Sequence, residues 1–171
     1  MTAEQRAAAI RMMVLDVDGV LTDGRLYYGP AGEALKVFDV RDGHGIKMML
    51  GAGIEVALLS ARHSEIVAAR ARELGIGRVL QGQSDKASGL AQLCADSQVT
   101  AQQCGYVGDD LPDLPVLRTV GFAATVSNAC VEVKAAAHFV ATQMGGCGAV
   151  RAIAEFVLRA RGDDPSRWVR G

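Results

Sequence analysis

Residues 12–24 read Met-Met-Val-Leu-Asp-Val-Asp-Gly-Val-Leu-Thr-Asp-Gly, and they constrain the fold more than any other stretch. The apolar run at the start is typical of a buried strand, and it delivers Asp16 and Asp18 at its carboxyl end. Two carboxylates at the exit of a buried strand are unfavourable unless they have a partner. In an open α/β sheet, that exit is also where ligands bind. The segment therefore predicts a cation site with a carboxylate nucleophile.

Length and composition place the chain among single-domain globular proteins. Half of its 171 residues are apolar and 22% are charged, which argues against disordered and membrane classes. The net charge of −1 gives no electrostatic basis for nucleic-acid binding. Four cysteines without a Cys-x-x-Cys pair favour reduced thiols over zinc or disulfide frameworks. Because no signal-peptide pattern and no apolar run of about 20 residues occur, we expect a cytoplasmic protein without membrane contact.

Strand patterns alternate with helical patterns along the chain. We expect strands near residues 12–17, 54–60, 78–81, 104–107, 120–124 and 138–140. Helices are expected near 42–50, 63–74, 86–95, 112–117 and 149–161, with a small one near 131. Residues 20–40 alternate around a Gly-Pro turn, which predicts a β-hairpin. The order predicts one α/β domain over residues 1–171, with a doubly wound parallel sheet and a projecting hairpin.

A second acidic cluster follows the strand expected at 104–107. Residues 108–113 read Gly-Asp-Asp-Leu-Pro-Asp. Taken alone, Asp16 and Asp18 are as compatible with a purely structural role, as a turn carboxylate and a helix cap, as with a functional site. Adjacent strand ends, however, would bring Asp16 and Asp109 together around one hard cation. Mg²⁺ suits oxygen ligands and keeps several waters, so a few protein ligands suffice.

Two further residues complete a set suited to phosphoryl transfer. Ser60 ends the second long strand, where its hydroxyl could bond a phosphoryl oxygen, and Lys86 begins a helix. Taken alone, Ser60 is more often a helix cap and Lys86 a solvated lysine. Their meaning depends on the order in which they occur with the acidic motifs.

In that order, the four motifs resemble those of the haloacid dehalogenase superfamily of phosphotransferases. The resemblance implies a Rossmann-like fold with Mg²⁺ as cofactor. Asp16 would attack phosphorus and form an aspartyl-phosphate, while Asp18 would protonate the leaving alcohol and then deprotonate the hydrolytic water. Ser60 and Lys86 would hold the phosphoryl group. The metal would be held by Asp16, Asp109 and the Asp18 main-chain carbonyl. Asp110 and Asp113 would tune the site from positions behind the metal ligands.

Motif spacing leaves no room for a separate lid domain. Only 44 residues separate Asp16 from Ser60, and 26 separate Ser60 from Lys86. In capless members of the superfamily, a neighbouring subunit usually shields the site. The alternative is an open site that acts on large substrates such as phosphoproteins.

Longer matches narrow the resemblance over residues 12–159. The stretches 22–24, 38–43, 60–62, 81–86, 108–111 and 145–151 are similar to the family of 3-deoxy-D-manno-octulosonate 8-phosphate (KDO 8-phosphate) phosphatases. This implies a phosphoric monoester hydrolase of lipopolysaccharide precursor biosynthesis, assembled as a homotetramer whose hairpins (about 20–40) cover neighbouring sites. It also implies a mobile C-terminal segment, about 145–171, whose Gly-rich start and Arg151 reach the site. The alternative for that Gly-rich start is an ordinary loop before a helix.

The substrate contacts follow from the same resemblance. A sugar acid phosphate carries a carboxylate and a phosphate, and guanidinium groups suit both. The expected contacts are Asp18, Asp39, Val40, Arg41, Asp42, Gly43, Lys47, Arg62, Arg70, Lys86 and Arg151. Arg70 could instead be a solvated residue on a helix face. Because Asp39 stands where asparagine is common and Lys47 replaces an arginine, a related nine-carbon sugar acid 9-phosphate stays open as the substrate.

A catalytically idle scaffold tetramer of the same fold is the competing class of function. The chain keeps the expected nucleophile, acid/base, lysine and metal aspartate, which favours an enzyme. Magnesium-dependent phosphate release would separate the two classes.

Overall fold

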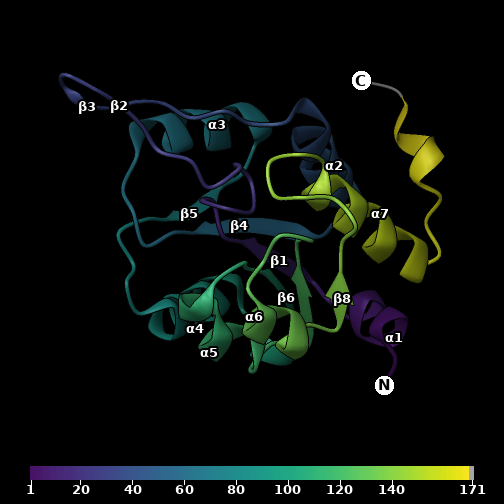
Figure 1. The fold of residues 1–171 in the computed structure, drawn as a ribbon. Coiled ribbons are helices and arrows are strands. Elements are labelled where there is room, and N and C mark those ends of the chain that lie inside the picture. The colour runs from purple at the N-terminus through teal and green to yellow at the C-terminus, as the bar shows by residue number, and fades with distance from the viewer. Residues whose placement is uncertain (170–171) are drawn as a thin grey trace.

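The protein is built on a six-stranded parallel sheet with helices on both faces (Figure 1). A computed structural model describes residues 1–169 of the chain. The strands are β1 (Met12–Leu15), β4 (Glu55–Leu59), β5 (Arg78–Leu80), β6 (Cys104–Val107), β7 (Phe122–Thr125) and β8 (Phe139–Val140). Their order across the sheet is β5-β4-β1-β6-β7-β8, so the chain fills one side of β1 and then the other. The predicted doubly wound α/β fold is confirmed.

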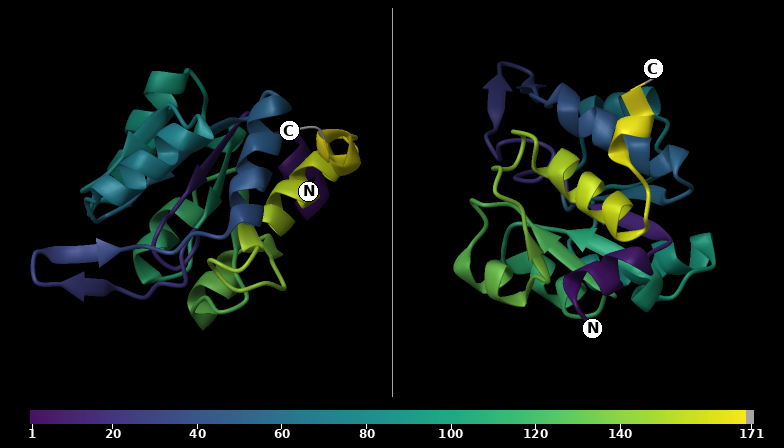
Figure 2. Two further views of the ribbon diagram at one scale, coloured as in Figure 1. Left: turned by 90° about the horizontal axis from the view of Figure 1, so that it is seen from above. Right: turned by 90° about the vertical axis from the view of Figure 1, so that its right-hand side faces the viewer.

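Helices cover the sheet in two layers (Figures 1 and 2). One layer holds α2 (Val40–Gly51), α3 (Glu65–Leu74) and α7 (Ala149–Ala160), with α1 (Ala3–Ala8) packed against α7. The other layer holds α4 (Lys86–Ser97), α5 (Leu114–Leu117) and α6 (Val131–Ala136). Three short 3₁₀ helices complete the elements: η1 (Ala101–Gln103), η2 (Leu111–Asp113) and η3 (Pro165–Val169). Within residues 1–169, no helix has both the length and the apolar character needed to cross a membrane.

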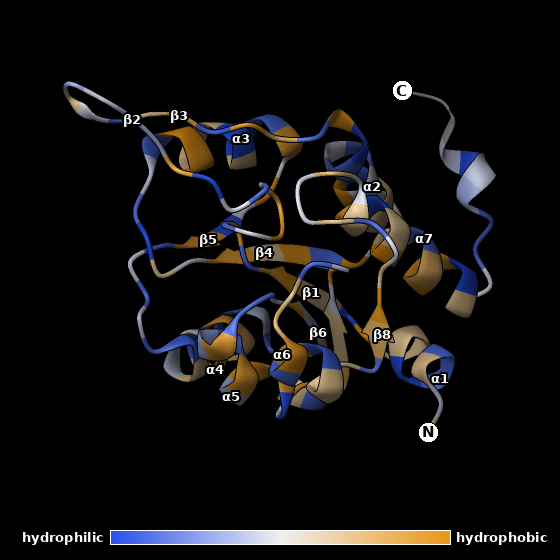
Figure 3. Cartoon of the chain, viewed as in Figure 1, coloured by the Kyte–Doolittle hydropathy of each residue, from blue (hydrophilic) through white to orange (hydrophobic). Residues whose placement is uncertain are grey.

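The central strands are mostly apolar, as expected for a sheet whose two faces are both covered by helices. Every residue of β1, β6 and β7 is buried. Figure 3 shows these strands in hydrophobic colours, whereas several of the connecting loops are hydrophilic. This packing fixes the carboxyl ends of β1, β4 and β6 relative to one another, and the candidate site lies there.

The predicted hairpin is formed by β2 (Tyr27–Gly29) and β3 (Gly32–Leu35), which pair in antiparallel fashion. It projects from the body of the molecule (Figure 2). Apolar side chains on and beside it are exposed, among them Tyr28 at 65% and Val37 at 55%. The described chain has no other domain between β1 and α4, so the prediction that a cap domain is absent is confirmed for residues 1–169.

Several predicted boundaries differ from the observed ones by two residues, and two of these differences have a clear local cause. Strand β1 ends at Leu15 and not near Val17, because the Val17 carbonyl accepts N–H bonds from Val20, Leu21 and Thr22 that turn the chain. Helix α2 begins at Val40 and not at Asp42, because the Asp39 side chain caps it by accepting the Arg41 N–H at 2.7 Å.

The middle of the C-terminal segment that we expected to be mobile, residues 149–160, forms a helix with a buried face. Helix α7 buries Val150, Ile153 and Val157 and packs against α2. The mobility of residues 145–171 stays a prediction. Because α7 is part of the core, we expect any motion in the described residues on either side of it. Residues 170 and 171 lie outside the part that the structure describes.

Candidate active site

The carboxyl ends of β1, β4 and β6 open into one hollow. The strand order reverses around β1 at this edge, which is where open α/β sheets bind ligands. The hollow measures about 360 Å³, a size suited to a small molecule. It is lined by Asp16, Asp18, Gly24, Ser60, Ala61, Arg62, Lys86, Asp109, Asp110, Pro112 and Asp113. All the residues predicted to be catalytic or to bind metal therefore lie in one place.

Lys86 forms a buried ion pair with the predicted nucleophile. It is the first residue of α4, and only 4% of its side chain is exposed. Its Nζ lies 2.7 Å from Asp16 Oδ2 and 2.6 Å from Asp113 Oδ1. Burial opposes the charge, but the two carboxylates outweigh it and raise the pKa of Lys86, so the ammonium is retained. The alternative of a solvated lysine is thereby excluded.

Asp113 organises the floor of the hollow. Its Oδ1 accepts bonds from Lys86 Nζ and from the Tyr106 hydroxyl, both at 2.6 Å. Its Oδ2 accepts the backbone N–H groups of Asp109 at 2.9 Å and Asp110 at 3.1 Å. Four donors occupy this carboxylate, which fits the predicted role behind the ligands and leaves little room for direct contact with a metal.

Asp16 and Asp109 concentrate negative charge in the hollow. Burial raises the pKa of Asp16 to about 6, although Lys86 favours its charged form. Burial and then repulsion from Asp16 raise the pKa of Asp109 to about 7. Oxygen atoms of Asp16, Asp109 and Asp113 lie within 4.8 Å of one another. A hard divalent cation would relieve this repulsion, so the donor set fits Mg²⁺.

These pKa shifts predict how the metal-free protein responds to pH. A carboxyl whose pKa is raised on folding stabilises the protein below about pH 4 and loses that contribution as pH rises through its folded pKa. In EDTA, the unfolding free energy should therefore fall between about pH 4 and pH 7. Asp109→Asn should reduce this fall by about 1–2 kcal/mol, allowing for partial exposure. Urea unfolding at several pH values measures it.

The matched control for this experiment is Asp96→Asn, which changes an exposed carboxylate at the far end of α4. Its stability should follow the parent profile at every pH. If Asp109→Asn also runs parallel to the parent, Asp109 does not carry the unfavourable charge.

Glycines bring the loop after β1 and the Gly-rich stretch into contact. Gly19 has φ of 86°, and a Cβ there would lie 2.1 Å from Asp109 Oδ2. A Cβ on Gly145 would lie 1.7 Å from the Gly19 carbonyl oxygen, and the Gly146 N–H donates to the Val20 carbonyl at 2.9 Å. Residues 145–146 therefore pack directly on the loop that carries Asp16 and Asp18.

Asp18 is flanked by two cations. Lys36 Nζ lies 2.5 Å from Asp18 Oδ1, and Arg62 Nε lies 3.5 Å from Asp18 Oδ2. Glu33 of β3 pairs with Lys36 at 3.1 Å and with Arg62 at 3.5 Å. Nothing in the sequence pointed to Lys36 or Glu33, because residues 34–38 indicate only a hairpin strand and Glu33 falls in the turn before it.

Ser60 is buried at the end of β4 and faces the hollow. Its Oγ accepts the Arg62 N–H at 3.2 Å, which helps to shape the turn. The cap position of α3 is occupied by Ser64. The alternative of a helix cap therefore does not apply to Ser60, and its position fits a contact with a phosphoryl oxygen.

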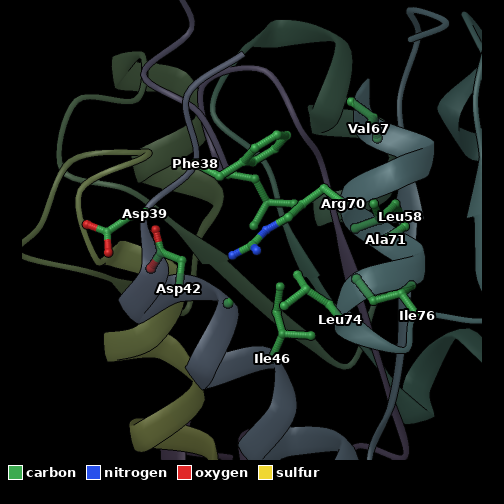
Figure 4. A pocket seen from close by; sticks show the side chains of 12 residues that line it. Phe38, Asp39, Asp42, Ile46, Leu58, Val67, Arg70, Ala71, Leu74 and Ile76 are labelled. Carbon is green, nitrogen blue, oxygen red and sulfur yellow. The ribbon is translucent and has the colours of Figure 1, made fainter. Parts of the chain in front are cut away.

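Arg70 lies at a second hollow, between α2 and α3, with Phe38 and Asp42 (Figure 4). Its guanidinium carbon is 5.9 Å from the centre of the Phe38 ring, and its Nη1 is 2.8 Å from Glu73 Oε2. Only 19% of the side chain is exposed, so Arg70 is largely covered and is not a solvated face residue.

The starts of α2 and α7 are tied together by other predicted substrate residues. Arg41 pairs with Asp39 at 2.6 Å. The buried Asp42 carboxylate accepts the Arg151 N–H at 2.8 Å. The Arg151 side chain turns to Glu155, with Nε 2.7 Å from Oε1. Within one subunit, these residues hold the fold together.

The predicted substrate residues thus divide into two groups. Asp18, Arg62 and Lys86 line the catalytic hollow. The other group lies along α2, α3 and α7, outside that hollow: Asp39, Val40, Arg41, Asp42, Gly43, Lys47, Arg70 and Arg151. Lys47, Val40 and Gly43 share a surface hollow with Arg70.

Comparison with known proteins agrees with this geometry. Residues 54–153 match the family model of the haloacid dehalogenase-like hydrolases. A relative from Yersinia pestis, 3-deoxy-D-manno-octulosonate 8-phosphate phosphatase KdsC, is 44% identical over 135 residues, which cover 79% of this chain and 72% of the relative.

Solved structures share the whole fold. A probable YrbI family phosphatase from Pseudomonas syringae pv. phaseolica 1448a has a TM-score of 0.94 at 44% identity, covering 99% of this chain and 98% of that one. A 3-deoxy-D-manno-octulosonate 8-phosphate phosphatase from Moraxella catarrhalis, in complex with magnesium, phosphate and KDO, has a TM-score of 0.91 at 39% identity and covers 94% and 92%. On the family match, the relatives and the site geometry, the chain belongs to the haloacid dehalogenase-like hydrolases.

Proposed function

We propose that the protein is a magnesium-dependent phosphatase that hydrolyses KDO 8-phosphate to KDO and inorganic phosphate. The observation that carries the proposal is the convergence of Asp16, Asp18, Ser60, Lys86 and Asp109 in one hollow. The similarity to KDO 8-phosphate phosphatases supports the choice of sugar. The reaction would serve lipopolysaccharide precursor biosynthesis in the cytoplasm.

The geometry supports a two-step transfer. The Asp16 carboxylate attacks phosphorus and forms an aspartyl-phosphate while the bond to the sugar oxygen breaks. Asp18 donates its proton to that leaving oxygen, then takes a proton from the water that attacks the phosphorus. The bond between phosphorus and Asp16 breaks and releases phosphate. The Lys86 ammonium, 2.7 Å from Asp16, and the Ser60 hydroxyl hold the transferring group.

The carboxylates of Asp16 and Asp109, with the Asp18 carbonyl, would hold Mg²⁺. When bound, the ion would shield the nucleophile from the phosphate and polarise the phosphoryl oxygens. Burial and repulsion from Asp16 raise the pKa of Asp109, and a bound cation would offset that repulsion. This supports Asp109 as a ligand. Mg²⁺ should raise the melting temperature of the parent and not that of Asp109→Asn, and equal shifts would remove Asp109 from the ligand set.

We further propose that the chain forms a homotetramer in which residues along α2 and α3 complete a neighbour's site. The catalytic hollow of one subunit offers Arg62 to a substrate that carries both a phosphate and a carboxylate. Asp39–Gly43, Lys47, Arg70 and Arg151 lie outside that hollow, so any contact that they make with a substrate would be with that of a neighbouring subunit. The exposed apolar residues of the hairpin supply a surface for assembly.

Light scattering tests the assembly. The parent should have four times the chain mass of 17.9 kDa. Val37→Asp, beside the hairpin, should shift the protein toward monomers, whereas Val131→Asp, which charges another exposed valine at the start of α6, should not. A monomeric parent with full turnover would overturn the tetramer and favour an open site for phosphoproteins.

A phosphate-release screen tests the substrate. The panel contains eight- and nine-carbon keto sugar acid phosphates, matched neutral hexose phosphates and a phosphopeptide. The highest kcat/KM should belong to KDO 8-phosphate. Preference for a nine-carbon acid 9-phosphate would replace the sugar and keep the chemistry, whereas no turnover of any member would favour the idle scaffold.

A further inference from the structure

The residue that contacts Asp18 most closely comes from the hairpin. Lys36 follows β3 directly, and only 2% of its side chain is exposed. Its Nζ lies 2.5 Å from Asp18 Oδ1 and 3.1 Å from Glu33 Oε1. The ammonium is therefore held between one carboxylate of the catalytic loop and one of the hairpin.

Asp18 has few other ways to be held. In the described chain, its carboxylate accepts a hydrogen bond only from Lys36, and Arg62 approaches its second oxygen no closer than 3.5 Å. Asp18 also lies in an irregular loop, beyond the end of β1. A proton donor must be positioned within hydrogen-bond reach of the leaving oxygen, so a free carboxylate in this loop would be poorly aimed.

Glu33 is the second carboxylate that holds the Lys36 ammonium. It pairs with Lys36 and with Arg62 at 3.5 Å, and it accepts a hydrogen bond from the Ser64 hydroxyl just before α3. Tyr28 of β2 accepts a bond from the Arg62 side chain at 3.3 Å. The hairpin is thus attached to the loop between β4 and α3 at several points, which limits the movement of Lys36.

We propose that Lys36 is a positioning residue: its ammonium holds one oxygen of the Asp18 carboxyl group, and the other oxygen carries the proton that passes to the leaving oxygen of its own subunit's substrate. This inference rests on the proposed phosphatase function and deepens it. It gives the hairpin a role inside its own active site, in addition to subunit assembly.

Leaving groups that differ in their need for a proton test the inference. A sugar alkoxide needs protonation to leave, whereas p-nitrophenolate departs without it. Because kcat/KM reports the transfer to Asp16, Lys36→Met should lower it about 10²-fold for the best sugar acid phosphate in the screen. For p-nitrophenyl phosphate, kcat/KM should change about threefold or less. A similar loss on both substrates would overturn the inference, and so would no loss on either.

A double-mutant cycle with Asp18 separates positioning from other roles. If Lys36 acts through Asp18, adding Lys36→Met to Asp18→Asn should cause no further loss of kcat/KM. A further loss would mean that Lys36 touches the substrate or supports the fold independently, and it would overturn the inference. Lys36→Arg, which keeps a cation at this position, should restore most of the lost activity.

Two controls keep the result interpretable. Arg25→Met removes a cation from the same segment, where 77% of the side chain is exposed, and should match the parent on both substrates. Lys36→Gln keeps a hydrogen-bond donor, and the same substrate contrast applies to it should Lys36→Met fail to fold. Since p-nitrophenyl phosphate reports the phosphatase reaction whatever the natural sugar, failure of the proposed substrate is distinguishable from failure of the role of Lys36.

Discussion

Asp16→Asn should abolish phosphate release while the fold persists. The amide cannot attack phosphorus, so kcat should fall about 10⁴-fold or more, as when other enzymes lose their nucleophile. The substituted side chain keeps an oxygen for the Val17 N–H, which Asp16 Oδ1 accepts at 2.7 Å. Lys86 keeps Asp113 as its partner at 2.6 Å. Circular dichroism and thermal melting should therefore stay close to the parent.

In the absence of Mg²⁺, Asp16→Asn should be slightly more stable than the parent. Burial makes the charged form of Asp16 unfavourable, which is why its pKa is raised, and an amide removes that penalty. Asp96→Asn is the control for the chemical change itself, because its side chain is exposed and distant along α4. It should retain parental turnover. Turnover by Asp16→Asn near the parental rate would mean that another group attacks phosphorus.

Asp113→Ala should cause the largest loss of stability among the changes considered. It removes the acceptor for the Lys86 ammonium, the Tyr106 hydroxyl and two backbone N–H groups. Removing one partner from a buried charged pair costs about 3–5 kcal/mol, because the other charge stays buried. Urea unfolding should report a decrease in free energy of that order, together with a strong loss of turnover from the displaced Lys86.

Asp85→Ala is the control with which the stability loss of Asp113→Ala is compared. Asp85 is the exposed N-cap of α4 and accepts the Ser88 N–H at 3.1 Å, so its loss should cost about 1 kcal/mol. Asp113→Asn keeps the shape and the acceptor for the N–H groups but not the charge, and it should fall between the two. If Asp113→Ala costs no more than Asp85→Ala, the Asp113 network is not what stabilises the floor of the hollow.

The sequence contained enough information to bring the catalytic residues together. Asp16 and Asp109 follow apolar runs that had to be buried strands, and parallel strands expose their carboxyl ends at one edge. Lys86 could be placed at a helix start, but its burial against Asp16 could not. That burial depends on how α4 packs on the sheet, which no local pattern encodes.

Lys36 and Glu33 illustrate what local patterns miss. The residues around them predict a hairpin, but they do not predict against which part of the molecule the hairpin packs. Contact between Lys36 and Asp18 depends on the direction in which the hairpin leaves the loop after β1. Similarly, the family resemblance named Arg70 and Lys47, but only the fold places them outside the catalytic hollow of the chain.

Asp16 should carry the phosphoryl group between the two steps of the reaction. The most direct measurement uses Asp18→Asn with p-nitrophenyl phosphate, because the aspartyl-phosphate still forms while its hydrolysis is slowed. Borohydride reduction converts an aspartyl-phosphate to homoserine, and peptide mass spectrometry then locates it. We expect one burst equivalent of nitrophenolate and homoserine at position 16. Steady turnover with no burst, or homoserine at any other aspartate, would contradict the account.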